Sequence, residues 1–380
     1  MTNSSVRESE TEGHIPSLDG VRGLAIIMVI GFHLIQGVPC IRQEVPGVIR
    51  KLSSLGQTGV DLFFVLSGFL ITGILLKHRS RDRALVNFWG RRFLRIFPLY
   101  YVVLAVVLFF PALRTLPLSS AAPDWWMWTY LANMPPTLWE QDVSLPHFWS
   151  LAVEEQFYLF WPLLILSLRP RNVGWVCITL FILAPLARGG CLSQGWSSFY
   201  ALPCRMDTLA AGGWLATQVH LKNFTESRLS RFRVAIPIVV MVSGVWFLLM
   251  AGKGSNVVQI AKHSICSVIF LWLIAECAVG TPSNYLNKAM CWSWLRGLGK
   301  YSYGLYVIHP LVMALANLIG TKTQGGIVIA TGTAIGVAGV SLALSMLSWS
   351  LLESPCLKLK RYFRYDVAPQ ASIAVAEVAE

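Results

Sequence analysis

The chain has 380 residues, of which 55% are hydrophobic and only 13% are charged, and its mean hydropathy is +0.57. Soluble domains usually carry about a quarter charged residues, so this composition predicts an integral membrane protein. The net charge of +12 does not indicate a nucleic-acid partner, because the basic residues form short clusters between apolar runs rather than one patch.

A membrane-spanning helix needs roughly 20 mostly apolar residues. We therefore predict an all-α integral membrane protein whose ten transmembrane helices lie at about 18–38, 58–76, 96–112, 149–168, 173–188, 199–219, 234–251, 260–279, 301–319 and 327–350. Residues 1–17 are polar and have no apolar region typical of a signal peptide, so we expect a disordered cytoplasmic leader. The membrane domain is then 18–355, and 356–380 is expected to be a basic, then flexible, cytoplasmic tail.

The distribution of basic residues predicts the orientation in the membrane. Seven of the 31 lysines and arginines lie between Lys77 and Arg95, and smaller groups begin at residues 169, 222, 288 and 358. If ten helices alternate in direction, all these groups lie on the same side as the N-terminus. Because cytoplasmic loops are rich in Lys and Arg, we predict that both termini are cytoplasmic.

The first predicted helix contains charged residues in an apolar run. Its sequence, SLDGVRGLAIIMVIGFH, includes Asp19, Arg22 and His33. Eleven residues turn an α-helix by about 1100°, so Arg22 and His33 project from nearly the same face, about 16 Å apart along the axis. Asp19 shares that face because it lies three residues before Arg22. Intramembrane charges are costly and are functional candidates by default, so we predict that this stripe lines a polar site.

The fourth predicted helix begins with FWSLAVEEQFYLFWP. Ser150, Glu154 and Tyr158 follow one another at intervals of four and therefore share a face, and Gln156 enters the membrane with them. We expect Glu154 at a depth similar to that of His33, where a carboxylate would fix the tautomer of the imidazole. The alternative is a helix-terminal glutamate that pairs with a lysine elsewhere.

A basic stretch precedes and enters the third predicted helix. It reads NFWGRRFLRIFPLYY and supplies Arg92 and Arg95, which are three residues apart. Positive charge on the cytoplasmic side explains such residues by itself. The alternative is a clamp for a phosphate-bearing donor, since the guanidinium group binds phosphate through two parallel hydrogen bonds.

Two further stretches carry polar residues among apolar ones. GVDLFFVLSGFLIT contains Asp61, with Gly59 and Gly68 positioned for close helix packing, and YSYGLYVIHPLV contains His309. The long outer loop at 113–148, rich in Trp, Tyr and Pro, is either an interfacial aromatic belt or a lid over an outward-facing site. The eight cysteines show no zinc spacing.

Five of these stretches together resemble the membrane-bound acyltransferase 3 family, whose members O-acylate cell-surface sugars, peptidoglycan and some antibiotics. In the family's order, from about residue 16 to 356, they are LDGVRGLAIIMVIGFH, GVDLFFVLSGFLIT, FWGRRFLRIFPLYY, FWSLAVEEQFYLFWP and YSYGLYVIHP. The resemblance implies a multi-pass protein of the bacterial inner (plasma) membrane. It implies acyl-CoA, commonly acetyl-CoA, as co-substrate, with no bound cofactor and no metal.

The resemblance also implies roles for individual residues. Arg22 and His33 match the family's Arg/Lys-X10-His motif, with His33 as the essential histidine. Arg92 and Arg95 match its RxxR element near the donor. The family's E-x-Q-F-Y element corresponds to the positions of Glu154, Gln156 and Tyr158.

The resulting hypothesis is acyl transfer to a hydroxyl of a carbohydrate, glycolipid or polysaccharide at the outer side of the bilayer. His33 acts as general base or as a transiently acylated nucleophile, Glu154 orients it, and Arg22 binds the donor or counters developing charge. The supporting residues are Asp19, Ser150, Gln156, Tyr158, His309 and Asp61.

Other functions remain open at this point. The acceptor could be a macrolide or another small molecule. A membrane-bound O-acyltransferase of the other large family would use His309 as its buried histidine. A proton-coupled transporter or flippase would use the same intramembrane groups without consuming a donor. The acyl length, the oligomeric state and a pairing of Cys40 with Cys191 are likewise open.

Overall fold

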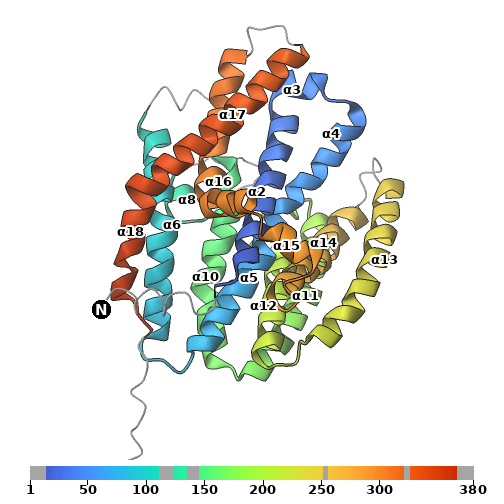
Figure 1. The fold of residues 1–380 in the computed structure, drawn as a ribbon, viewed down its shortest axis with the longest axis vertical. Coiled ribbons are helices and arrows are strands. Elements are labelled where there is room, and N and C mark those ends of the chain that lie inside the picture. The colour runs from blue at the N-terminus through green and yellow to red at the C-terminus, as the bar shows by residue number, and fades with distance from the viewer. Residues whose placement is uncertain (1–13, 111–123, 135–144, 251–255, 321–325, 366–380) are drawn as a thin grey trace, which may run out of the picture.

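The protein is all-helical in the part of the chain that the computed structural model describes, which is residues 14–110, 124–134, 145–250, 256–320 and 326–365 (Figure 1). Each of the ten predicted spans corresponds to one long helix. These helices are α2 (Pro16–Gly37), α5 (Gly59–His78), α6 (Ala84–Phe109), α10 (Trp149–Ser167), α11 (Pro170–Ser193), α12 (Met206–His220), α13 (Glu226–Met250), α14 (Asn256–Ala278), α16 (Ser293–Gly320) and α17 (Ile327–Ser348).

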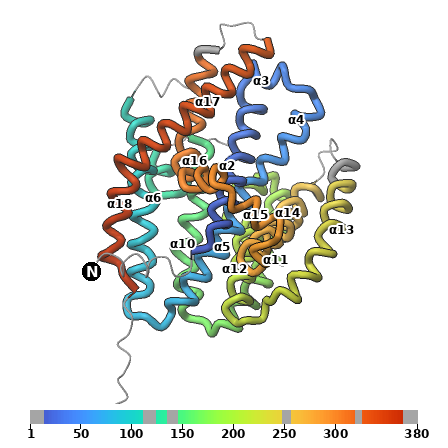
Figure 2. Tube along the Cα trace, in the orientation of Figure 1, coloured from blue at the N-terminus to red at the C-terminus, as the bar shows by residue number. Residues whose placement is uncertain are grey.

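Short helical segments connect the long ones, as the chain trace in Figure 2 shows. At the end of the molecule drawn uppermost, α3 and α4 follow α2 (Figure 1). The connecting segments are α3 (Pro39–Glu44), α4 (Gly47–Ser53), η1 (Ser54–Thr58), α8 (Trp125–Trp128), η2 (Pro146–Phe148), η3 (Leu202–Arg205), α15 (Tyr285–Met290), the π-helical turn η4 (Trp349–Glu353), α18 (Ser354–Lys358) and η5 (Leu359–Tyr362).

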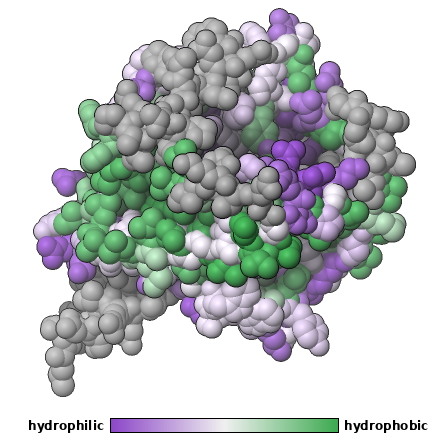
Figure 3. Space-filling model, turned by 90° about the horizontal axis from the view of Figure 1, so that it is seen from above, coloured by the Kyte–Doolittle hydropathy of each residue, from purple (hydrophilic) through white to green (hydrophobic). Residues whose placement is uncertain are grey.

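Seven stretches of the described chain are long and apolar enough to cross a membrane, and they contain α2, α5, α6, α11, α13, α14 and α17. A multi-pass membrane protein is therefore supported, whereas the count of ten and the cytoplasmic termini stay predictions. The helices α10, α12 and α16 fall outside this group. Most of α12 is buried inside the protein, where a helix needs no apolar face toward lipid. Figure 3 shows hydrophobic side chains in a broad band across the molecule and a group of hydrophilic ones right of the centre.

Helices α5 and α12 approach each other very closely. A Cβ atom added to Gly68 would lie 1.9 Å from the carbonyl oxygen of Leu209, and one added to Gly212 would lie 1.9 Å from that of Val65. Only glycine leaves room for two backbones at this distance. The predicted packing role of Gly59 is also confirmed, because its Cβ would meet the Ala25 oxygen at 2.7 Å.

Two helices extend beyond the predicted spans in a way that matters for the site. Helix α6 begins at Ala84 rather than near residue 96, so Arg91, Arg92 and Arg95 lie within the helix. Helix α2 begins at Pro16, with proline in the first turn, where its missing N–H costs nothing. The last two residues of the predicted leader therefore belong to the helix. The rest of the leader, up to residue 13, lies outside the described residues.

The predicted tail begins with residues that pack against α6. Asn87 donates a hydrogen bond to the carbonyl oxygen of Arg364 at 2.7 Å, and Arg91 donates one to that of Phe363 at 3.2 Å. The Tyr365 ring stacks on His78, with ring centres 4.0 Å apart. The C-terminal segment 359–365 is thereby fixed across the N-terminal part of α6, and residues 366–380 lie outside the described part.

Candidate active site

A large basic cavity of about 610 Å³ opens between α2, α6, α16 and the C-terminal segment. Its lining contains seven basic side chains and one acidic one, Asp19. The basic side chains are Arg22, Arg91, Arg92, Arg95, Arg296, Lys300 and Lys360. Such an excess of positive charge favours a ligand that carries several phosphate groups.

The sequence-predicted arginines occupy the inner end of this cavity. Arg22 donates to Asp19 at 2.8 Å, which confirms that these two residues share a helix face. The Cζ atom of Arg92 lies 5.4 Å from the centre of the Tyr158 ring, and that of Arg95 lies 5.5 Å from the Trp349 ring. These aromatic faces hold the guanidinium groups by cation–π attraction and leave their N–H edges for a ligand.

A second, smaller cavity of about 120 Å³ adjoins the first. The two cavities share Arg22, Arg92 and Arg95 in their linings. From these arginines the inner cavity extends between α5, α6, α10 and α16. Its polar lining consists of Ser67, Ser150, Glu154, Tyr158, Ser302, Tyr303 and Tyr306. The predicted common face of Ser150, Glu154 and Tyr158 is confirmed, because all three line this cavity.

Glu154 accepts a hydrogen bond from a serine rather than from a histidine. Ser67 donates to its Oε1 atom at 2.7 Å, and the Tyr158 hydroxyl donates to Ser67 at 3.0 Å. The expected contact of Glu154 with His33 was wrong, since Glu154 faces the inner cavity beside Arg22 and Arg92.

The side chain that contacts His33 is His309 of α16. The distance from His33 Nδ1 to His309 Nε2 is 3.2 Å, and the ring centres lie 5.1 Å apart. His309 is fully buried, whereas His33 is half-buried. Arg22 and His33 thus both lie beside α16, as one stripe of α2 requires. Sequence spacing could not show this pairing, because it joins residues 276 positions apart.

The inner cavity ends close to this histidine pair. Tyr306 lines the cavity, and its ring centre lies 6.0 Å from that of His309, one helical turn further along α16. The Tyr306 hydroxyl donates to the His147 carbonyl oxygen at 3.0 Å and also bonds Ser150. Tyr306 therefore borders both the inner cavity and His309, whereas neither His309 nor His33 is among the residues that line the two cavities.

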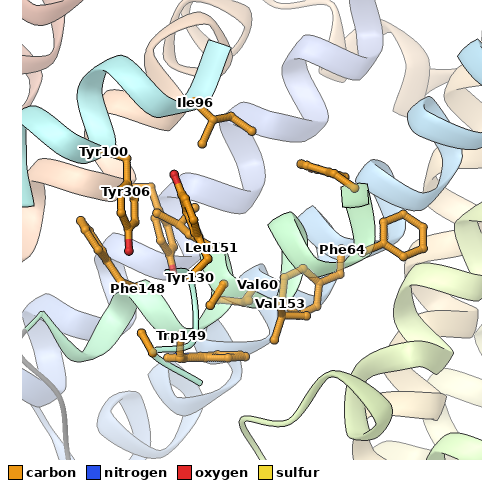
Figure 4. Packing of buried hydrophobic residues seen from close by; sticks show 14 of the residues in the cluster. Val60, Phe64, Ile96, Tyr100, Tyr130, Phe148, Trp149, Leu151, Val153 and Tyr306 are labelled. Atoms are coloured by element: carbon orange, nitrogen blue, oxygen red, sulfur yellow. The ribbon is translucent and has the colours of Figure 1, made fainter. Parts of the chain in front are cut away.

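Gln156 has a positioning role in the structure and is absent from the cavity linings. It donates to the carbonyl oxygen of Tyr130 at 2.9 Å and to Asn133 Oδ1 at 2.8 Å. The Tyr130 ring stacks on Tyr100 with ring centres 4.2 Å apart (Figure 4). The described part of the predicted aromatic loop is thus packed into the protein, whereas residues 111–123 and 135–144 lie outside the described chain.

Asp61 lies away from both cavities, so its expected place in the site was wrong. Its carboxylate accepts from Arg205 Nη1 at 2.9 Å and lies 2.9 Å from His263 Nδ1. A second buried ion pair, Arg188 with Asp207 at 2.8 Å, lies nearby on α11 and α12. These paired charges satisfy one another inside the membrane region, which is how buried charges are tolerated.

The cysteines are all free among the described residues, which contain all eight. The open pairing of Cys40 with Cys191 is not present in the structure. Instead, the Sγ atom of Cys191 lies 3.7 Å from that of Cys204.

Several cavity residues carried too weak a sequence signal to be selected. Arg296, Lys300 and Lys360 looked like ordinary cytoplasmic charge, and Tyr365 lay in the segment expected to be flexible. The sequence showed Ser67 as a polar residue in an apolar run, but it did not show that Ser67 bonds Glu154. Only the packing of α2, α6 and α16 brings these residues to one cavity.

Comparison with known proteins agrees with the motif pattern. A family model described as an acyltransferase domain, acyltransferase 3, matches residues 15–347. The chain belongs to this family. No solved structure matches it. The match covers α2 and α6, which carry Arg22, His33 and the two clustered arginines, and it ends within α17.

Curated relatives of this family member come from several bacteria. It is 28% identical over 370 residues to a protein named peptidoglycan O-acetyltransferase OatA from Listeria monocytogenes, covering 91% of this chain and 56% of the relative. It is 29% identical over 332 residues to O-acetyltransferase OatA of Staphylococcus aureus (80% and 51%). Identity is also 29% over 332 residues to the putative peptidoglycan O-acetyltransferase YrhL of Bacillus subtilis (80% and 49%). The chain thus spans about half the length of these relatives.

Proposed function

We propose that this protein is a membrane O-acyltransferase that moves an acetyl group from a phosphate-bearing thioester donor, acetyl-CoA, to a hydroxyl group of a cell-envelope carbohydrate. The names of its relatives make peptidoglycan the first acceptor to test. The proposal includes the predicted ten spans, both termini in the cytoplasm and a location in the bacterial inner membrane.

One observation carries the proposal: the basic cavity and the inner cavity share three arginines. A donor with a nucleotide diphosphate at one end and a thioester at the other needs both environments. Its phosphates fit the seven basic side chains, and its thin acyl-bearing arm fits a cavity of about 120 Å³. Arginine recognises phosphate oxygens through paired N–H groups, which anchors such a donor in one orientation.

The roles of individual residues follow the course of the donor. Arg92 and Arg95 bind phosphate at the inner end of the basic cavity. Arg22, oriented by Asp19, directs the donor into the inner cavity. The acyl group then reaches the region of Tyr306 and the histidine pair. His33 removes the proton of the acceptor hydroxyl, a role that typically contributes 10²–10⁴-fold to a rate.

The decisive experiment is transfer of radiolabel in proteoliposomes. The full chain is reconstituted, labelled acetyl-CoA is supplied on one side, and soluble peptidoglycan fragments are supplied on the other. The wild-type protein should label the fragments. His33→Ala should lower the rate by at least about 10²-fold, and the pair Arg92→Gln with Arg95→Gln should raise the KM for the donor. Arg231→Gln, at an exposed position of α13, is the matched control.

The outcomes separate the candidate functions. Labelled fragments support the proposal. If a macrolide or another small molecule is labelled and the fragments are not, the protein is an acyltransferase with a different acceptor. If acetyl-CoA is not consumed with either kind of acceptor, the protein is not an acyltransferase. Movement of a tracer across the vesicle without loss of acetyl-CoA would instead support a transporter.

A further inference from the structure

The geometry points to a single protonation pattern for the His33–His309 pair, and we infer that His309 is a positioning residue that holds His33 with its Nε2 atom unprotonated. The inference rests on the proposed acyl transfer, in which His33 is the base. Its first step, however, depends only on hydrogen-bond geometry and is testable without a substrate.

The pattern starts at a backbone carbonyl of α16. The Nδ1 atom of His309 lies 2.8 Å from the carbonyl oxygen of Leu305. A carbonyl oxygen only accepts hydrogen bonds, so His309 Nδ1 carries the hydrogen. A neutral imidazole has one N–H, which leaves His309 Nε2 as an acceptor. A second proton would create a charged ring at a fully buried position, where desolvation is costly.

The same reasoning then applies to His33. Its Nδ1 atom lies 2.9 Å from the Val29 carbonyl oxygen and 3.2 Å from His309 Nε2. Both neighbours are acceptors, so His33 Nδ1 must be the donor. The single hydrogen of the neutral ring is thereby used, and His33 Nε2 keeps a free lone pair. The opposite assignment would direct lone pairs at one another at both contacts.

The packing of α2 on α16 fixes this arrangement. A Cβ atom added to Gly299 would lie 1.8 Å from the carbonyl oxygen of Asp19, and one added to Gly23 would lie 2.1 Å from that of Leu295. The two backbones are therefore in direct contact near one end of the pair of helices. Because each ring also bonds a carbonyl of its own helix, its position follows from the backbone.

The arrangement suits one catalytic step. The acceptor hydroxyl gives its proton to His33 Nε2 while its oxygen forms a bond to the acyl carbon. The carbon–sulfur bond of the thioester breaks, and the thiolate leaving group takes the proton back from His33 Nε2. While His33 carries both protons, its Nδ1–H bond to His309 is charge-assisted and therefore stronger. His309 thus fixes the tautomer and orientation of His33, as the carboxylate does in a Ser-His-Asp triad, although it is neutral.

Two other titratable rings, His147 and Tyr306, lie close to the pair. The ring centre of His147 is 6.0 Å from that of His309, and its Nε2 atom lies 3.3 Å from the Val307 carbonyl oxygen. Tyr306 is equally near His309 but its hydroxyl donates to the His147 backbone. Neither residue is hydrogen-bonded to His33 in the described chain, so His147 provides a matched control.

The test combines nitrogen-15 NMR of histidine-labelled full-length protein in nanodiscs with kinetics. In the wild type, His33 should show a protonated Nδ1, an unprotonated Nε2 and a through-hydrogen-bond coupling to His309. His309→Leu, which has no acceptor, should lower kcat by at least about 10²-fold at an unchanged donor KM. His309→Gln, whose amide oxygen can replace the Nε2 acceptor, should recover at least tenfold of that loss. His147→Gln should leave the His33 signals unchanged.

Two results would overturn the inference. The first is a protonated Nε2 on His33 in the wild type, and the second is a wild-type kcat in His309→Leu. If His309→Leu does not fold, the NMR spectrum of the wild type still tests the protonation of His33. If the wild type transfers no acyl group but shows the expected protonation, the proposed function fails while the protonation pattern stands.

Discussion

Arg205 Nη1 lies 2.9 Å from Asp61 Oδ1, and both side chains are almost completely shielded from solvent. The other carboxylate oxygen of Asp61 lies 2.9 Å from His263 Nδ1, and the Arg205 guanidinium lies over the Phe199 ring at 4.1 Å. This network links α5, η3 and α14. Removal of one partner would leave a buried charge without compensation.

Asp61→Asn should therefore lower the free energy of unfolding by about 3–5 kcal/mol, since it leaves the buried Arg205 charge unpaired. The measurement is thermal or denaturant unfolding of the purified protein in detergent micelles. Asp82→Asn changes an exposed carboxylate and serves as the control. A wild-type stability for Asp61→Asn would contradict a structural role for this ion pair.

The contact of α5 with α12 predicts a large effect for a small substitution. Gly68→Ala would direct a methyl group at the Leu209 carbonyl at 1.9 Å, and overpacking typically costs about 1–3 kcal/mol or more. We expect a lower melting temperature and less protein in the membrane fraction. Gly332→Ala adds the same methyl group where nothing lies within 4 Å and should behave like the wild type. Equal effects of both variants would disprove the close contact.

Substitutions of Arg22 can distinguish the effect of its positive charge on activity from the effect of its hydrogen-bond geometry. Arg22→Lys retains the positive charge but loses the planar guanidinium that bonds Asp19 and lines both cavities. Hydrogen bonds to charged groups contribute about 1.5–3 kcal/mol, so we expect kcat/KM for acetyl transfer to fall by about tenfold. In Arg22→Gln, which loses the charge as well, kcat/KM should fall by about 100-fold or more. A Lys variant as active as the wild type would indicate that charge alone is needed.

The rim of the basic cavity should act through long-range charge. Reversing two of its exposed cations, Arg296→Glu with Lys300→Glu, should raise the donor KM by about tenfold, since exposed ion pairs contribute about 0.2–1 kcal/mol each. The increase should shrink when the salt concentration rises, because salt screens exposed charges. Arg228→Glu with Arg231→Glu, at the start of α13, is the matched control. A KM change that does not depend on salt would contradict this explanation.

Gln156 should control the order of the segment that carries Tyr130 and Asn133. Gln156→Leu removes both hydrogen bonds that its amide donates and leaves the Tyr130 carbonyl and the Asn133 side chain without these donors. Hydrogen–deuterium exchange followed by mass spectrometry should show faster exchange in residues 126–134. The peptide that covers α17 should exchange at the wild-type rate. Unchanged exchange in 126–134 would show that aromatic packing alone orders this segment.

The sequence by itself determined the features that depend on helix periodicity. Apolar runs of about 20 residues located the ten long helices, and spacing placed Asp19 beside Arg22 and put Ser150, Glu154 and Tyr158 on one face. These are local properties, because the rise and turn of an α-helix are the same wherever it occurs. Local rules were weaker at helix ends, where α6 extends twelve residues further toward the N-terminus than predicted.

The tertiary structure alone decided which faces meet. Glu154 and Asp61 were both recognised as polar residues in apolar runs, yet one is held by Ser67 and the other by Arg205 and His263. His33 contacts His309 because α2 packs against α16, with the two backbones touching near Gly23 and Gly299. No spacing rule connects residues 276 positions apart, since their distance depends on how all the intervening helices pack.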